Sequence, residues 1–141
     1  MGELDFENVV FGYSGNTLFN DFSASFAKGQ ISCIVGPNGC GKSTLAKLAM
    51  GLIKPASGRV LIQGRDVASL NPRERARRLG VLVQQQEAPM MTVRELAACG
   101  RFPHHGPLSR LDETDAQCID ETLSLAGVYD LRDRPLRSLS G

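Results

Sequence analysis

Apolar and polar residues alternate near the start of the chain, as they do in β-strands that have one side in water. In residues 21–26 (DFSASF) every second residue is apolar, and residues 4–11 (LDFENVVF) are also typical of a strand. The stretch YSGNT between them is rich in turn-forming residues. The pattern therefore predicts a mostly antiparallel β lobe over residues 1–30.

The pattern then changes to short apolar runs. Residues 31–35 (ISCIV) and 80–83 (GVLV) are mostly apolar, which indicates strands buried on both faces, as in a parallel sheet. Between them, residues 58–64 (GRVLIQG) predict a strand between glycine turns. A helix is expected before Pro55, because four apolar residues recur there at helical spacing: Leu45, Leu48, Ala49 and Leu52.

From Thr92 onward the pattern is helical. Thr92 and Glu95 have the spacing of a capping box at the start of a helix. A second helix is predicted within residues 112–127, and Gly127 is expected to end it. Its apolar face is expected to consist of Ala116, Ile119 and Leu123.

Composition excludes several classes of protein. The 141 residues include 16 Lys and Arg and 15 Asp and Glu, so the net charge of +1 indicates no nucleic-acid partner and no basic membrane-binding surface. The four cysteines form no CxxC pair, which argues against a zinc site. No apolar run approaches the roughly 18 residues of a membrane span, and no signal peptide is found. We therefore expect a cytoplasmic chain that reaches a membrane only through a partner.

The stretch GPNGCGKST, residues 36–44, matches the phosphate-loop pattern GxxxxGK[ST]. It follows a predicted strand and opens a predicted helix, which is the context that this loop requires. Its glycines allow successive N–H groups to point inward, and the helix N-terminus adds the positive end of its dipole. Nine residues are therefore expected to contact nucleotide phosphates: Gly36, Pro37, Asn38, Gly39, Cys40, Gly41, Lys42, Ser43 and Thr44.

Two side chains of this loop carry the predicted chemistry. Lys42 is expected to reach the β- and γ-phosphates as a mobile positive charge, in a catalytic role. Ser43 is expected to ligate a Mg²⁺ ion that bridges the same phosphates. The loop therefore predicts a nucleoside triphosphate and Mg²⁺ as its ligands.

GTPases do not fit the chain, because their motifs DxxG and NKxD are both missing. Along its whole length, the sequence instead resembles the ATP-binding subunits of ABC transporters. Residues 51–67 look like the stretch that follows the phosphate loop in that family, and Tyr13 stands where the family has an aromatic residue that stacks on adenine. The resemblance therefore implies ATP as the nucleotide.

Residues 80–86 (GVLVQQQ) resemble the Q-loop of this family, a strand that ends in glutamine. Gln84 directly follows the apolar run, so alignment favours it as the residue that senses Mg²⁺ and the γ-phosphate. Gln85 is the next candidate, and Gln86 also remains open. A glutamine amide suits this catalytic and metal-binding role, because it both accepts and donates hydrogen bonds.

Residues 92–106 (TVRELAACGRFPHHG) resemble the subset of subunits that serve importers of iron–siderophore, haem or cobalamin. His104 and His105 lie in this stretch. Two adjacent histidines in a loop make a poor chelate without further ligands. We therefore expect both to be exposed loop residues that bind no metal.

The chain ends on Leu139, Ser140 and Gly141, which match the first three positions of the family's signature LSGGQ. In the family, Ser140 and the N–H of Gly141 would contact the γ-phosphate held by a second subunit. The family's catalytic Glu, metal-ordering Asp and switch His follow the signature. CIDE, residues 118–121, is no substitute, since it precedes the signature and its period is helical. We therefore expect a truncated chain that hydrolyses ATP negligibly by itself and is poorly soluble.

Together these features predict an α/β fold of the P-loop NTPase class, ABC ATPase type, in incomplete form. Residues 1–30 would form the antiparallel β lobe and residues 31–84 the nucleotide-binding core, with part of a parallel sheet. Residues 85–141 would contain the Q-loop and most of a helical subdomain.

The resemblance implies an energy subunit that binds MgATP, dimerises head to tail and drives transmembrane permease subunits at the inner face of the cell membrane. Two alternatives remain open. One is a soluble ABC ATPase of translation or DNA maintenance, and the other is a nucleotide-binding remnant without catalysis.

Overall fold

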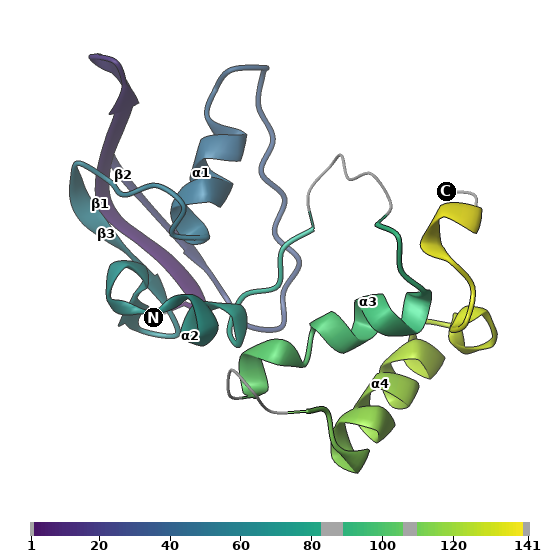
Figure 1. Ribbon diagram of the computed structural model, residues 1–141. Coiled ribbons are helices and arrows are strands. Elements are labelled where there is room, and N and C mark those ends of the chain that lie inside the picture. The colour runs from purple at the N-terminus through teal and green to yellow at the C-terminus, as the bar shows by residue number, and fades with distance from the viewer. Residues whose placement is uncertain (1, 83–88, 106–109, 140–141) are drawn as a thin grey trace. The chain divides into compact units, whose positions relative to one another are not determined.

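The computed structural model describes residues 2–82, 89–105 and 110–139 (Figure 1). The chain divides into two compact units, Met1–Val81 and Leu82–Gly141. The first unit contains a sheet and the predicted phosphate loop, whereas the second is helical. Each unit has its own apolar core.

Four antiparallel strands form one sheet in the first unit, in the order β2-β1-β3-β4. They are β1 (Leu4–Tyr13), β2 (Asn16–Phe26), β3 (Ser57–Ile62) and β4 (Arg65–Asp66). β1 and β2 form a hairpin that turns at Ser14 and Gly15, both of which have a positive φ. The predicted antiparallel lobe and the strand between glycine turns are confirmed, although β2 begins earlier than the alternation indicated.

Helix α1 (Lys42–Ala49) lies beside this sheet (Figure 1). The predicted apolar spacing is confirmed by the core of the unit, which joins the helix to β1 and β3 through Phe6, Val9, Phe11, Leu45, Leu48, Ala49, Val60, Ile62 and Val67. Leu52 was wrongly expected on this face. The helix ends at Ala49 and the chain turns at Gly51 with a φ of 64°, which leaves Leu52 67% exposed.

Two short elements follow the sheet along the chain: a 3₁₀ turn (Val67–Ser69) and helix α2 (Pro72–Ala76). Asn71 accepts a hydrogen bond from the N–H of Glu74, and the Glu74 carboxylate accepts one from the N–H of Asn71. This capping box, with Pro72 in the first turn, determines locally where α2 begins.

The buried strands predicted at residues 31–35 and 80–83 are not formed in the described residues, of which Val83 is not one. Both segments lack strand pairing, and their apolar side chains are exposed; Ile31 and Leu82 are 103% and 93% accessible. A strand of a parallel sheet needs hydrogen-bonding neighbours along its edges and cover on both faces. The sheet that the structure describes is wholly antiparallel and pairs with neither segment, so their apolar composition alone does not make them strands.

The second unit is built on α3 (Val93–Cys99) and α4 (Glu113–Leu125). Among the described residues of this unit, three 3₁₀ turns accompany them: Phe102–His104, Tyr129–Leu131 and Leu136–Ser138. Val93 of α3 and Ile119 and Leu123 of α4 form the buried core. In the parts of the chain that the structure describes, no helix is both long and apolar enough to cross a membrane.

The ends of these helices follow the local sequence signals. Thr92 Oγ1 accepts a hydrogen bond from the N–H of Glu95 at 3.2 Å, and the Glu95 carboxylate accepts one from the N–H of Thr92 at 2.7 Å. These bonds stabilise the charged carboxylate and lower the pKa of Glu95. Gly127 follows α4 with a φ of 69°, as a helix stop requires.

Ala116 was wrongly predicted on the buried face of α4. It is exposed, whereas Asp115 is 1% exposed and lies in line with buried Ile119 and Leu123 at intervals of four residues. A carboxylate therefore occupies a core position of this helix.

Candidate nucleotide-binding loop

Two glycines determine the backbone conformation of the loop that precedes α1. Gly39 has a φ of 82° and Gly41, the residue before the first turn of α1, has a φ of 100°. Residues with a Cβ rarely adopt such angles. A Cβ on Gly41 would also lie 2.8 Å from Cζ of Phe19, a residue of β2. The glycine at this position therefore lets the helix begin close against the sheet.

A second close approach shapes the start of the loop. A Cβ on Gly36 would lie 2.7 Å from Sγ of Cys40, so the thiol side chain lies across the loop from Gly36. The N–H of Cys40 donates to the carbonyl of Pro37 at 3.4 Å, which closes a turn between them. The predicted loop is therefore a compact turn, and residues 36–40 are exposed to solvent.

Lys42 reaches back over this turn. Its Nζ donates to the carbonyl oxygens of Gly36 and Pro37, at 2.7 Å each, and lies 3.8 Å from Sγ of Cys40. The ammonium group is thereby held by the turn that precedes α1. The N-terminal end of a helix carries free N–H groups and a partial positive charge, so the arrangement suits an anion such as a phosphate.

Ser43 and Thr44 occupy the first turn of α1 but have different surroundings. Ser43 is exposed, so its hydroxyl is available to a ligand, whereas Thr44 is 8% exposed. Thr44 Oγ1 lies 3.5 Å from the hydroxyl of Tyr13, which comes from the end of β1. The structure thus brings Tyr13 next to the predicted phosphate loop, across a long separation in sequence.

The ring of Tyr13 is positioned by an aromatic neighbour. It meets the ring of Phe11 edge to face, with centroids 4.9 Å apart and an interplanar angle of 88°. The residue remains 47% exposed. A fixed and partly exposed aromatic ring beside a phosphate loop provides a surface on which a nucleobase could stack.

Several predicted site residues lie outside the described residues. These are the glutamine of the Q-loop, Gln84, its competitors Gln85 and Gln86, and the signature residues Ser140 and Gly141. Their predicted roles therefore stay predictions.

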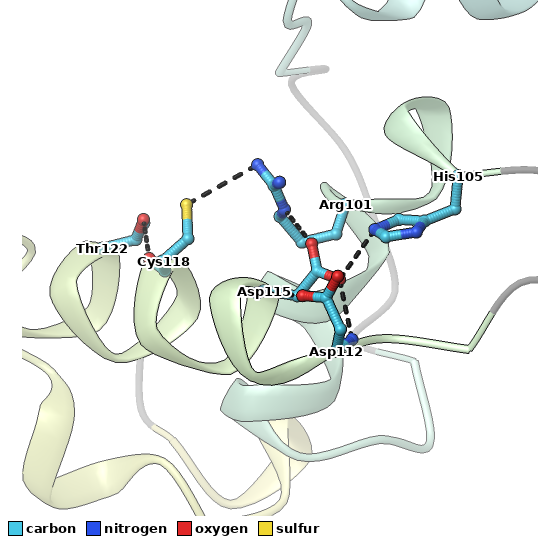
Figure 2. A network of polar contacts seen from close by, with 6 residues as sticks. All are labelled: Arg101, His105, Asp112, Asp115, Cys118 and Thr122. Atoms are coloured by element: carbon cyan, nitrogen blue, oxygen red, sulfur yellow. Dashed lines mark hydrogen bonds and ion pairs between the residues drawn. The ribbon is translucent and has the colours of Figure 1, made fainter.

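The two histidines differ from each other. His104 is exposed, as predicted, but His105 is not, because its side chain is 17% exposed and its Nε2 lies 2.7 Å from Oδ2 of Asp115 (Figure 2). No group of three or more potential metal ligands occurs among the described residues. Sequence reasoning missed this contact, since His105 follows a 3₁₀ turn and Asp115 lies in α4. The one feature of the sequence that could have indicated this contact is Asp115, which lies in line with the apolar positions Ile119 and Leu123 of α4.

Comparison with known proteins places the chain in a family. The family description for ABC transporters matches residues 19–141. The chain is 34% identical over its full length to the iron(3+)-hydroxamate import ATP-binding protein FhuC of Bacillus subtilis, of which it covers 53%. It is 34% identical over 98% of its length to the cobalamin import ATP-binding protein BtuD of Halobacterium salinarum, of which it covers 34%.

A solved structure gives the same result. The ADP conformation of MJ1267, an ATP-binding cassette of an ABC transporter, matches all of this chain with a TM-score of 0.80 and 30% identity, over 60% of that cassette. The predicted α/β fold class is therefore confirmed. The chain spans about half the length of the FhuC protein that it matches. Because the family description covers residues 19–141, most of the chain, the chain belongs to the ABC transporter family of ATP-binding proteins.

Proposed function

We propose that residues 36–44 bind the phosphates of ATP together with Mg²⁺. The observation that carries this proposal is the position of Lys42, whose Nζ is held at 2.7 Å by two carbonyls of the loop in front of α1. A phosphate at this place would be stabilised by the ammonium group, by hydrogen bonds from the free N–H groups of the helix and by the helix dipole.

Ser43 is the proposed Mg²⁺ ligand within the described residues. Its exposed hydroxyl lies in the first turn of α1, directly after Lys42. Hydroxyl and amide oxygens are hard ligands of the kind that Mg²⁺ accepts. Gln84 is proposed as the second protein ligand on the strength of its alignment with the family. The bound Mg²⁺ would neutralise charge on the phosphates.

Tyr13 is proposed to stack on the adenine. Its contact with Thr44 and its edge-to-face packing on Phe11 hold the ring beside the loop and leave it partly exposed. Stacking tolerates any base, so this contact would add affinity without choosing between adenine and guanine.

The transport role is proposed from the relatives. FhuC is named for the import of iron(3+)-hydroxamate and BtuD for that of cobalamin. We propose that the protein containing this chain powers import of a ferric siderophore, with haem or cobalamin as alternative substrates, by ATP binding and hydrolysis. It would act on the inner face of the cell membrane, bound to transmembrane permease subunits.

The proposed working form is a head-to-tail dimer. In it, Ser140 and the N–H of Gly141 of one subunit would contact the γ-phosphate held by Lys42 of the other. ATP favours such a dimer when it contacts both subunits, and hydrolysis removes that preference. We propose that the 141-residue chain by itself binds nucleotide weakly. It would hydrolyse ATP negligibly, because its sequence offers no counterpart of the family's catalytic Glu and switch His.

The test is the affinity for a fluorescent ATP analogue, measured by titration with Mg²⁺ present. Lys42→Ala should weaken binding at least ten-fold, since it removes a charged contact worth about 1.5–3 kcal/mol. Lys47→Ala is the matched control, because Lys47 lies in the last turn of the same helix and is exposed. Equal affinity of the Lys42→Ala and Lys47→Ala proteins would refute the site.

A further inference from the structure

The aspartate buried in α4 is the strongest feature that the nucleotide site leaves unexplained. Asp115 occupies an apolar register position and its side chain is only 2% exposed. A buried carboxylate is costly unless charged or hydrogen-bonding partners compensate for the lost water. The groups around Asp115 must therefore supply that compensation.

Two hydrogen-bond donors and one imidazole nitrogen surround the Asp115 carboxylate (Figure 2). Arg101 Nε donates to Oδ1 at 2.7 Å, and the N–H of Asp112 donates to Oδ2 at 2.9 Å. His105 Nε2 lies 2.7 Å from the same Oδ2. Arg101 and His105 lie on the C-terminal side of α3, and Asp112 caps α4, so one carboxylate joins the two ends of the connection between these helices.

The charges of this cluster balance only when the histidine is protonated. Asp112 and Asp115 are the two negative groups, and the Asp112 carboxylate itself accepts from the N–H of Asp115 at 2.9 Å. Arg101 is one permanent positive charge, and its Nη1 also lies 3.6 Å from Sγ of Cys118. His105 is the second positive charge, present only in its protonated form.

The contact between His105 and Asp115 is short but poorly aligned. Its Nε2 is fully covered by protein, and the contact does not meet the angular requirement of a hydrogen bond. The energy of a misaligned contact comes little from hydrogen bonding and mainly from the attraction between opposite charges. Protonation of the imidazole should therefore matter more here than in a well-aligned bond.

We propose that Arg101, His105 and Asp115 form a pH-sensitive tether between the end of α3 and the start of α4. When His105 is protonated, two cations hold the carboxylate. When His105 is neutral, Arg101 is the one cation that contacts Asp115 among the described residues, and residues 101–105 are held less firmly to α4. The tether is a conformational device of the helical unit and is separate from the phosphate loop in sequence.

The direction of the pH dependence follows from which group titrates. The N–H of Asp112, followed by His105 and Arg101, keeps the pKa of Asp115 well below its ordinary value, so this carboxylate stays ionised at any physiological pH. An ordinary histidine changes charge between about pH 5 and 8. A protonated imidazole attracts the Asp115 carboxylate more strongly than a neutral one, so the tether is expected to be firmer at acid than at alkaline pH.

The test compares thermal unfolding of the 141-residue chain and its variants at pH 5.5 and pH 8.0. His105→Gln should lower the melting temperature by ~3–5 °C at pH 5.5 and by much less at pH 8.0. His104→Gln is the matched control, because His104 is the exposed neighbour, and it should follow the wild type at both values. An equal loss at both pH values, or no loss at either, would overturn the tether.

A second measurement needs no variant at the histidine, in case His105→Gln does not fold. NMR titration of the wild-type chain should show the amide signal of Asp112 shifting between pH 5 and 8, because this N–H donates to the carboxylate that His105 contacts. Amides near Asp120, which pairs with Arg94 instead, serve as the internal control. The absence of a shift at Asp112 in this range would contradict the proposal.

Discussion

The hydroxyl of Tyr13 lies 3.5 Å from Oγ1 of Thr44, so the end of β1 contacts the first turn of α1. Thr44 is buried and directly follows the two residues proposed to bind phosphate and Mg²⁺. This contact ties the candidate base-binding residue to the candidate phosphate loop. Tyr13 therefore has two proposed roles: its ring would stack on the base, and its hydroxyl would position the start of α1 through Thr44.

Stacking predicts that the ring of Tyr13 matters more than its hydroxyl. Tyr13→Ala should weaken ATP binding by roughly ten-fold or more, since stacking on an aromatic residue is worth about 1–3 kcal/mol. Tyr13→Phe keeps the ring and should retain most of the affinity. Calorimetric titration of both variants with MgATP checks this prediction. If the Phe variant binds as weakly as the Ala variant, the hydroxyl contact with Thr44 is what matters.

Gly41→Ala should damage both stability and nucleotide binding. The φ of 100° costs a residue with a Cβ about 1–2 kcal/mol, and the new methyl group would lie 2.8 Å from Phe19. Gly15→Ala is the control, because Gly15 has a φ of 86° but an added methyl group there would have no atom within 4 Å. The control should lose some thermal stability and keep its affinity for ATP. Normal ATP affinity in Gly41→Ala would count against the close approach to the sheet.

Leu48→Ala should destabilise the first unit by about 2–5 kcal/mol, because Leu48 is 1% exposed in the core between α1 and the sheet. Leu52→Ala makes the same chemical change at a side chain that is 67% exposed, and should cost less than about 0.5 kcal/mol. Urea unfolding followed by circular dichroism compares the two. Similar losses in both variants would show that Leu48 does not pack between α1 and the sheet.

Asp115→Asn should destabilise the helical unit at neutral pH and leave the chain less sensitive to acid. The folded-state pKa of Asp115 is lowered, so the stability it adds is present above its ordinary value, about 3.9, and is lost as the pH falls through the folded value. The wild type and the variant should therefore converge at strongly acid pH.

The control for this prediction is Asp133→Asn, because Asp133 is 79% exposed and lies 3.6 Å from Arg132. It should change the melting temperature little at any pH, as exposed ion pairs contribute little. Melting curves from pH 2 to 7 give the comparison. A constant difference between wild type and Asp115→Asn over this range would mean that the carboxylate contributes through packing rather than charge.

Local signals in the sequence predicted local structure well. The capping box of Thr92 and Glu95 and the stop at Gly127 are confirmed because each depends on backbone groups within a few residues. The glycine pattern of the candidate phosphate loop is also a local signal, since Gly39 and Gly41 adopt a positive φ that glycine allows by itself.

Predictions failed where a residue's environment comes from distant parts of the chain. Apolar residues 31–35 indicate a buried strand only if neighbouring strands pair with them, and the antiparallel sheet of the first unit provides none. The periodicity of α4 placed Ala116 in the core, whereas the core position belongs to Asp115. No apolarity scale would choose a carboxylate there, because its burial depends on Arg101 and His105.

By itself, the sequence determined the glycine turns ahead of α1, the capping box of Thr92 and Glu95 and the stop at Gly127, because these depend on short spacings and on backbone preferences of single residues. Only the tertiary structure decided that Tyr13 meets Thr44 and that His105 meets Asp115. Such contacts join residues brought together by the pairing of strands and the packing of helices. The free energy of these contacts depends on burial and on charge in the folded state. Neither can be calculated from the composition or periodicity of the sequence.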